Sequence, residues 1–414
     1  MESEDVLVIG GGVIGVCSAY YLASRGIKVT LIEKDEIASG CSYGNGGLIV
    51  PSHGVPLASP GALGDGLRWL LDSESPFYIK PRLDVDLIRW LVRFVFASQK
   101  RNMLRSLPIL RDLLFASRAL YEELSHTAGF DFGFEGHGSL LVCLSKRALE
   151  HEHSEAQLLE RFNIPFKVLE QAEVHELEPA LLPEVAGGLF YPRDGHIDPA
   201  HFVIGLAEKA QGLGAQVWTK TEAMGFETSQ GRITQVHTTR GDFHPKQVVL
   251  ATGSWSPAIA RALNLRIPIQ AAKGYSLTLE NPPITPKLPL LFSEASVVVN
   301  PLGETLRIAG TLELAGMDFS FNSRRVNAIR RSASAYLPGL DNAKVIEVWR
   351  GLRPCTPNGL PIIGRANHYD NLIVAAGHAM LGMSLGPITG KLVSQLAAAE
   401  EMELDGSPFA ANKL

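Results

Sequence analysis

The sequence predicts an α/β protein that joins a parallel sheet with flanking helices to a second, α+β domain, and three observations support this fold class. A short apolar strand near the N-terminus is followed at once by a glycine-rich turn and a helix. Two more strands that end in glycine-containing turns occur far downstream, near residues 250 and 375. The length of 414 residues favours two or three domains over one.

The first of these elements belongs to a complete β-α-β unit. Residues 6–9 (Val-Leu-Val-Ile) have the continuous apolar pattern of a strand that is buried on both faces. The helical pattern that follows ends near Gly26, and Val29–Ile32 is the second strand. The unit therefore begins a parallel sheet.

The turn inside this unit carries the G-x-G-x-x-G pattern of a dinucleotide site. Gly10 permits the tight turn, Gly12 lets a pyrophosphate approach the backbone, and Gly15 lets the helix pack closely on the strand. The start of the helix offers free N–H groups and a positive dipole to phosphates. Glu33 ends the second strand, where a carboxylate accepts hydrogen bonds from ribose and repels a 2′-phosphate, so NADP is disfavoured. The motif alone does not separate FAD from NAD.

Later segments extend this site. Residues 39–47 form a small, polar, glycine-dense loop whose backbone can approach a second part of a long cofactor. Strands are expected at residues 216–218, 232–238, 248–250 and 372–375, with a helix at 387–396. Glycine turns after strands at both ends of the chain indicate one cofactor site that is built from distant segments.

Composition excludes other classes. The 38 Lys+Arg and 43 Asp+Glu give a net charge of −5, which argues against a nucleic-acid binder because such a protein needs a basic face. Acidic rather than basic residues precede the first apolar run, so no signal peptide is expected. The four scattered cysteines suit neither a metal site nor a disulfide framework, and a cytoplasmic location is expected.

Residues 83–97 form an apolar stretch that is too short to span a membrane. Asp86, Arg89 and Arg93 interrupt it at i, i+3 and i+7, and so form one narrow polar stripe on a helix. Two interpretations are open: a mostly buried helix with a solvated edge, and a helix that lies on the inner face of the membrane.

A series of motifs runs in order along nearly the whole chain. They are VIGGGVIG at residues 8–15, S-x-x-N-x-G at 42–47, ATGSWS at 251–256, KGYS at 273–276, GLRP at 351–354, PIIG at 361–364 and GHAMLG at 377–382. In this order they resemble the FAD-dependent D-amino-acid oxidase and glycine oxidase superfamily, and most closely its bacterial D-amino-acid dehydrogenase branch.

The resemblance implies a glutathione-reductase-type, Rossmann-like FAD domain from residues 1–82, 192–266 and 346–414. A substrate domain with an antiparallel sheet over the flavin would comprise residues 83–191 and 267–345. The implied FAD-binding residues lie in or near the glycine motifs and turns described above: Gly10, Gly12, Val13, Ile14, Gly15, Glu33, Lys34, Ser42, Asn45, Gly46, Gly47, Leu48, Ala223, Gly253, Trp255, Gly377, His378, Leu381, Gly382 and Met383.

Three residues are candidates for the substrate side. Arg353 would bind the substrate carboxylate through two parallel hydrogen bonds, with a structural ion pair as the alternative. Tyr275 would donate a second hydroxyl hydrogen bond, and His53 would face the substrate or the surface. Cys355 is either a packed thiol or, as in sarcosine oxidases of the superfamily, a covalent link to FAD.

The implied reaction is oxidative deamination of a D-amino acid or cyclic imino acid, with hydride transfer from Cα to flavin N5. Glycine oxidases have a tyrosine where residues 296–299 read Ser-Val-Val-Val, so an apolar wall and a larger or cyclic side chain are expected here. Electrons would pass to a quinone or another acceptor. The alternatives are a flavin-bearing subunit of a hetero-oligomer similar to D-hydroxyproline dehydrogenase, opine oxidase or hydrogen cyanide synthase, an oxygen-using glycine- or sarcosine-type oxidase, and an NAD-linked dehydrogenase.

Overall fold

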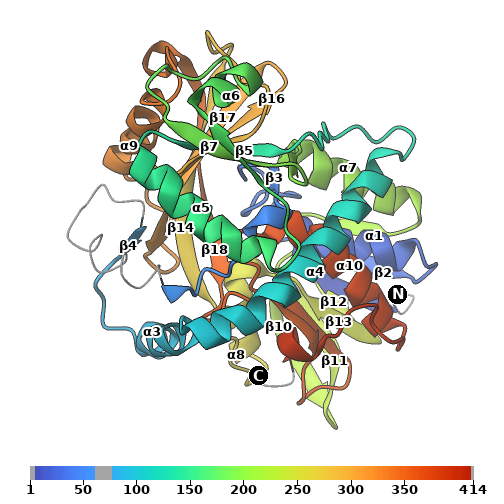
Figure 1. Ribbon diagram of the computed structural model, residues 1–414. Coiled ribbons are helices and arrows are strands. Elements are labelled where there is room, and N and C mark those ends of the chain that lie inside the picture. The colour runs from blue at the N-terminus through green and yellow to red at the C-terminus, as the bar shows by residue number, and fades with distance from the viewer. Residues whose placement is uncertain (1–4, 61–76, 412–414) are drawn as a thin grey trace.

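The computed structural model describes residues 5–60 and 77–411 and contains two large sheets. Figure 1 shows a smaller sheet in the lower part of the view and a larger one above it, with two long strands that run down between them. The predicted α/β fold class is confirmed.

The smaller sheet has six strands in the order β19-β20-β13-β1-β2-β9. All neighbours are parallel except β19 and β20. The strands are β1 (Val6–Ile9), β2 (Val29–Ile32), β9 (Gln216–Trp218), β13 (Gln247–Leu250), β19 (Ile362–Arg365) and β20 (Leu372–Ala376). Five of them are the strands expected from the sequence, and the apolar pattern located them because both faces of this sheet are buried.

Side chains of β1 alternate between two hydrophobic cores. Val6 and Val8 join the core under the helices, whereas Leu7 and Ile9 join the core on the opposite face. The first core is covered by α1 (Val13–Ala23), α4 (Lys100–Ser125), α7 (Pro199–Gly212) and α10 (Gly382–Ala397). The second is covered by a three-stranded sheet of β10 (Ala223–Ser229), β11 (Arg232–Thr238) and β12 (Gly241–Phe243), with α8 (Ser256–Arg261) beside it.

The larger sheet has nine strands and is mainly antiparallel. Its path is β18-β14-β17-β16-β15-β5-β7-β6, and β4 pairs with β17. The strands are β4 (Phe77–Ile79), β5 (Ser139–Cys143), β6 (Lys167–Glu170), β7 (Gly187–Tyr191), β14 (Gln270–Glu280), β15 (Leu290–Phe292), β16 (Val297–Leu302), β17 (Thr305–Leu314) and β18 (Lys344–Cys355). Helices α5 (Lys146–Glu160), α6 (Gln171–Leu177) and α9 (Ser323–Ser334) pack against it.

Two features bear on the predicted domain division. The boundary between residues 345 and 346 falls inside β18, which pairs with β14 along its whole length. Helix α4, assigned to the substrate domain, packs on α10 of the FAD-binding part. The division itself stays a prediction. The short pair β3 (Leu48–Ile49) and β8 (Gly195–His196) lies wholly within the predicted FAD-binding part.

The helix expected at residues 83–97 is α3 (Val85–Ala97), but it is not mostly buried, so that interpretation is wrong. Only Leu87, Trp90 and Phe94 of this helix are buried, because it packs on the rest of the protein along one narrow line. Most of its remaining apolar residues are exposed. In the described part of the chain, no helix is both long and apolar enough to cross a membrane.

Candidate active site

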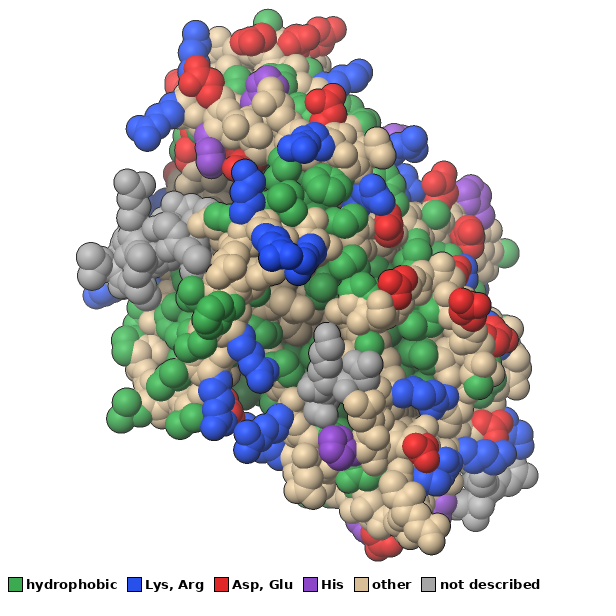
Figure 2. Space-filling model, turned by 60° about the horizontal axis from the view of Figure 1, so that its bottom comes forward, with side chains coloured by type: hydrophobic (Ala, Val, Ile, Leu, Met, Phe, Trp, Pro, Cys, Tyr) green, Lys and Arg blue, Asp and Glu red, His purple; other side chains and the backbone are tan. Residues whose placement is uncertain are grey.

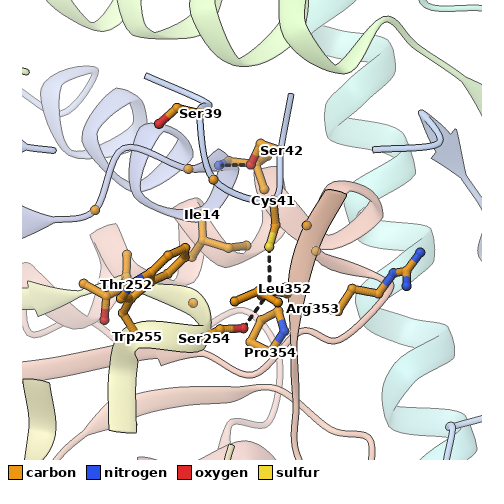
Figure 3. Close-up of a pocket in the computed structure, with 18 of the residues that line it drawn as sticks. Ile14, Ser39, Cys41, Ser42, Thr252, Ser254, Trp255, Leu352, Arg353 and Pro354 are labelled. Atoms are coloured by element: carbon orange, nitrogen blue, oxygen red, sulfur yellow. Dashed lines mark hydrogen bonds between the residues drawn. The ribbon is translucent and has the colours of Figure 1, made fainter. Parts of the chain in front are cut away.

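A cavity of about 580 Å³ lies between the two sheets. It is lined by the β1–α1 turn, the loop at residues 39–46, the segment after β13, the end of β18 and the start of α10. In Figure 3, Trp255 and Thr252 lie at one end of the view and the guanidinium of Arg353 at the other. Segments that are hundreds of residues apart in the sequence therefore share one elongated site.

The β1–α1 turn has the geometry that the glycine motif predicts. Gly10 has φ +113°, and a Cβ there would lie 2.6 Å from the carbonyl oxygen of Ala251. A Cβ on Gly15 would lie 1.8 Å from the carbonyl oxygen of Gly10. No side chain caps the start of α1 at Gly12, although the N–H of Val13 donates to Ser42 Oγ at 2.9 Å. An uncapped helix start beside an open glycine turn fits a pyrophosphate.

The carboxylate of Glu33 is fixed at the end of β2. It accepts hydrogen bonds from the N–H of Gly11 at 2.6 Å and the N–H of Asp35 at 2.9 Å. Next to it, the ammonium of Lys34 lies 4.4 Å from the ring centroid of Trp255. These groups and Ala223 line the same end of the cavity, where a flat aromatic ring and an anion suit an adenine and its ribose.

The loop at residues 39–46 forms the middle of the cavity. Asn45 Oδ1 accepts from the N–H of Gly47 at 2.9 Å, which holds the loop in its turn. A Cβ on Gly46 would lie 3.7 Å from Val298 and 3.8 Å from Ala309, so the neighbouring wall is apolar. Cys41 and Ser254 both donate to the carbonyl of Leu352, and these two bonds attach the loop and the turn after β13 to β18 (Figure 3).

The start of α10 lies at the cavity as well. Gly382 and Met383 line it, and no side chain caps the helix. His378 is buried with Nε2 3.0 Å from Thr389 Oγ1, and burial lowers the pKa of its imidazole to about 3. The histidine is therefore neutral, and the positive end of the helix dipole is what remains to stabilise an anion here.

The guanidinium of Arg353 is held in a defined position near the end of β18. Its Nη1 donates to the carbonyl of Thr311 at 2.7 Å, and its guanidinium lies over Gly274, where a Cβ would be only 1.9 Å from Nη1. Thr311 has φ +63°, at a bulge where the pairing of β14 and β17 shifts from Lys273↔Glu313 to Tyr275↔Gly310. The strained residue thus turns its carbonyl toward the guanidinium.

Within the described residues, no carboxylate lies within ion-pair distance of Arg353. Burial lowers the pKa of its guanidinium, which nevertheless remains protonated. The structural ion pair considered above is absent from the described part of the chain. A half-buried cation that lines a cavity and has only one neutral acceptor is suited to bind an anionic ligand.

Tyr275 lines the cavity, and its hydroxyl oxygen has one donor from the protein. The phenol oxygen accepts a hydrogen bond from the N–H of Asn322 at 3.2 Å. Burial and the nearby charge of Glu313 raise the pKa of the phenol, so it stays protonated. Glu313 belongs to a buried cluster in which Lys273 Nζ lies 3.6 Å and Arg325 Nε 3.4 Å from its oxygens. This cluster joins β14, β17 and α9 behind the site.

Most of the residues predicted from the sequence line the cavity, and six do not: His53, Gly15, Gly47, Leu48, Gly377 and Leu381. Gly15, Gly47 and Gly377 shape the backbone instead, since a Cβ on any of them would lie within 2.5 Å of a neighbouring atom. His53 lies on the short helix Pro51–His53, 3.1 Å from Ser52 Oγ, and burial lowers its pKa to about 4.

Cys355 is packed away from the cavity. Its side chain is fully buried in a cluster with Trp90 and Phe94, and burial raises the pKa of the thiol to about 12. A protonated, inaccessible thiol is a poor nucleophile. The packed-thiol interpretation therefore fits the geometry.

Several lining residues had no signal that sequence reasoning could use. Trp349 and Arg350 precede Arg353 on β18, and Arg350 lies over the rings of Phe319 and Phe321. Gly274 lies in the KGYS motif, but only the packing of β18 on β14 shows that its missing side chain makes room for Arg353.

Comparison with known proteins gives a consistent result. The family model described as FAD dependent oxidoreductase (DAO) matches residues 5–396. A D-amino acid dehydrogenase of Xanthobacter autotrophicus is 31% identical over 407 residues, which cover 97% of this chain and 96% of that protein. A D-amino acid dehydrogenase of Methylobacterium radiotolerans is 32% identical over 415 residues, 98% of each chain.

Solved structures of related fold cover the chain from end to end. Glycine oxidase from Geobacillus kaustophilus superposes with a TM-score of 0.80 at 25% identity and covers 100% of both chains. L-proline dehydrogenase from P. horikoshii has a TM-score of 0.76 at 23% identity and covers 100% of this chain and 98% of that one. The second likeness concerns the fold alone.

Proposed function

This chain belongs to the DAO family of FAD-dependent oxidoreductases, and on that premise we propose that it oxidises D-amino acids to 2-oxo acids. FAD is its cofactor. The glycine cradle at the start of α1, the uncapped start of α10 and the fixed carboxylate of Glu33 fit this group. The NAD-linked alternative is therefore set aside.

The observation that carries the proposal is the guanidinium of Arg353 in the cavity wall, which has no carboxylate partner among the described residues. An amino acid presents a carboxylate, and a guanidinium binds a carboxylate through two parallel hydrogen bonds that fix its orientation as well as its charge. Thr311 occupies one donor atom, Nη1, and the other nitrogens are available for a ligand. We assign Arg353 as the residue that binds the substrate carboxylate.

Bound FAD would supply the acceptor for the hydride that leaves the substrate Cα. The residues of this chain bind and orient. Gly10, Gly12 and Ser42 would hold the pyrophosphate, and the start of α10 would stabilise negative charge at its end of the cavity. Tyr275 lines the cavity and accepts a hydrogen bond from the N–H of Asn322, which leaves its own O–H as a donor that we propose for the substrate carboxylate.

The substrate loses a hydride from Cα and a proton from nitrogen, and the imine so formed reacts with water to give the 2-oxo acid and ammonia. A cyclic imino acid would stop at the cyclic imine. Val298 and Ala309 present apolar surface beside Gly46, as the Ser-Val-Val-Val segment predicts. This supports a preference for larger or cyclic side chains over glycine.

We propose a quinone, or another acceptor, as the electron acceptor. The alternatives are an oxygen-using oxidase and the flavin-bearing subunit of a hetero-oligomer. A cytoplasmic location fits the four cysteines, all of which are free thiols. Peripheral contact with the inner face of the membrane would bring the cavity to such an acceptor, and the surface of α3 supports it.

The decisive test is an assay of the purified chain with a dye acceptor and matched D- and L-amino acids that include D- and L-proline. We expect a yellow protein with a flavin spectrum that reduces the dye with D-substrates. Dye reduction with L-substrates alone would overturn the stereochemical part of the proposal. Flavin-bearing protein that is inactive until a second subunit is added would favour the hetero-oligomer.

Arg353→Leu tests the assigned residue. Losing a charge-assisted pair should raise KM on the order of 100-fold while the flavin stays bound. Arg350→Leu on the same strand is the comparison, since that guanidinium lies over Phe319 and Phe321, and its effect on KM should be much smaller. An unchanged KM in Arg353→Leu would remove Arg353 from the site.

A further inference from the structure

A second concave surface lies on the outside of the protein, beside α3. This groove of about 840 Å³ is lined by α3, by Pro257 and Arg261 of α8 and by the segment that leads into β14. Four arginines line it, Arg89, Arg93, Arg261 and Arg266, against one acidic residue, Asp86. We call this surface the arginine groove. It is locally basic in a chain whose net charge is −5.

The charges in the arginine groove are not balanced within the described part of the protein. Asp86 is shared by Arg261 at 3.2 Å and Arg89 at 3.7 Å. Arg93 and Arg266 are exposed and have no carboxylate partner among the described residues. The groove therefore presents two uncompensated guanidinium groups that can bind phosphate oxygens.

The exposed face of α3 is apolar. Val85, Ile88, Val92, Val95 and Phe96 are between 51% and 63% exposed, and Leu83 just before the helix is fully exposed. At 3.6 residues per turn these five positions fall on one face of the helix. We call them the apolar stripe. Figure 2 shows hydrophobic side chains gathered at the lower left of the view, with Lys and Arg side chains beside them.

The two surfaces are adjacent by helix geometry. Arg89 and Arg93 are four residues apart on one side of the helix, and by helix geometry they lie between the apolar stripe and the buried line of Leu87, Trp90 and Phe94. This order, apolar then cationic, is the arrangement of a helix that lies in a bilayer interface with its arginines at the level of the phosphates.

We propose that the apolar stripe and the arginine groove together form a binding site for an anionic phospholipid bilayer, with lipid phosphates in the groove and the stripe against the acyl boundary. The inference deepens the proposed use of a quinone acceptor and rests on it for its purpose. Trp90 Nε1 donates to the carbonyl of Cys355 at 2.9 Å, two residues from Arg353. The surface is thus attached to the strand that carries the substrate site.

A second copy of the chain is a poorer occupant. A symmetric dimer through α3 would bring the same patch of both subunits together. It would then place two sets of uncompensated arginines opposite one another, and like charges at an interface are unfavourable. An anionic surface satisfies the arginines and covers the apolar stripe at the same time.

Flotation of the holoenzyme with vesicles tests the site. We expect the wild type to float with vesicles of phosphatidylcholine and phosphatidylglycerol, weakly with phosphatidylcholine alone, and less as salt is added. Ile88→Asp with Val92→Asp should lower partitioning to both vesicles at least about tenfold. Arg93→Glu with Arg266→Glu should remove roughly tenfold or more, and only from the anionic vesicles.

Matched controls are available on exposed surfaces elsewhere. Ile204→Asp changes an exposed isoleucine of α7, and Arg147→Glu reverses an exposed charge of α5. Both should float as the wild type does. All variants should keep their flavin and their turnover with the dye, which separates failure of this site from failure of the proposed reaction.

Four results would overturn the proposal. The active wild type fails to float with anionic vesicles, or it floats equally with both vesicles. In the third result, the variants of α3 and of the arginine groove float with vesicles as the two control variants do. A dimer that dissociates on Ile88→Asp with Val92→Asp would instead make the apolar stripe an interface between copies.

Discussion

The two ends of the cavity are built in different ways. At the nucleotide end, Gly10, Gly15 and Glu33 lie within 24 consecutive residues, and one β-α-β unit places them. At the opposite end, Arg353, Thr311 and Gly274 come from three strands of the larger sheet, and only the pairing of those strands brings them together. The first end therefore depends on the geometry of a single turn. The second end depends on the register in which three strands pair.

The largest expected effect is at the nucleotide end. Gly15→Ala would place a Cβ 1.8 Å from the carbonyl oxygen of Gly10, and the two atoms cannot move apart without separating α1 from β1. We expect a protein without bound flavin, or one that does not fold, as measured by the flavin absorbance per protein and by thermal unfolding.

Gly212→Ala is its control. Gly212 is the last residue of α7, and a methyl group added there would have no neighbouring atom within 4 Å, so this variant should keep its flavin and its melting temperature. If Gly15→Ala also kept both, the tight packing of the turn would not be what the nucleotide end depends on.

The next largest effect is expected at the Arg353 end of the cavity. Gly274→Ala would put a Cβ 1.9 Å from Nη1 of Arg353, so the guanidinium must move away. The nucleotide end of the cavity would not change. KM should rise roughly tenfold or more with flavin content unchanged. Steady-state kinetics and the flavin spectrum measure the two separately.

A double variant distinguishes this positioning role from general damage to the sheet. In the Arg353→Leu background, Gly274→Ala should add little to KM, because the group it displaces is already gone. Gly225→Ala, in a strand of the three-stranded sheet with only His237 within 4 Å, is the control. Equal effects of Gly274→Ala in both backgrounds would show that Gly274 does not act through Arg353.

Sequence reasoning predicted the glycine turn and the strands beside it well, for a physical reason. A turn that needs φ > 0 at Gly10 and close packing at Gly15 leaves glycines at fixed spacing, and strands buried on both faces leave apolar runs. The five strands expected in the parallel sheet were found there. The domain division, by contrast, cut through β18, because the sequence carries no mark at the point where a long strand passes between domains.

At the Arg353 end, the sequence offered candidate residues but not their arrangement. The GLRP motif made Arg353 a candidate, but the position of its guanidinium depends on a bulge at Thr311. Thr311 has φ +63°, a conformation that the preferences of threonine do not predict. Tyr275 was expected to donate to a ligand, and this stays a prediction, while the bond that its oxygen accepts from the N–H of Asn322, 47 residues away, had no signal in the sequence. The sequence of α3 was ambiguous in a similar way. Its apolar pattern is the same whether the second face of the helix is covered by protein or exposed to solvent.

The smallest effect concerns His378, which lines the cavity and is buried as the neutral imidazole. Its pKa is lowered from an ordinary 6.5 to about 3 by burial. Above pH 6.5 neither the folded nor the unfolded state holds the proton. As the pH falls below 6.5 the unfolded state binds it first, so the free energy of unfolding decreases down to about pH 3, by at most about 1.4 kcal/mol per pH unit.

Urea unfolding at saturating FAD should show the free energy of unfolding decreasing as the pH falls through this range. In His378→Gln the slope of free energy against pH should be smaller by the contribution of about one proton. His151→Gln, at an exposed histidine of α5, is the matched control and should keep the slope of the wild type. Asp194 acts in the opposite sense, since burial raises its pKa to about 6 and favours the protonated folded state, so only the difference between variants isolates His378. Equal slopes in all three proteins would mean that His378 takes up its proton without unfolding, and that its surroundings open more readily than the nucleotide end does.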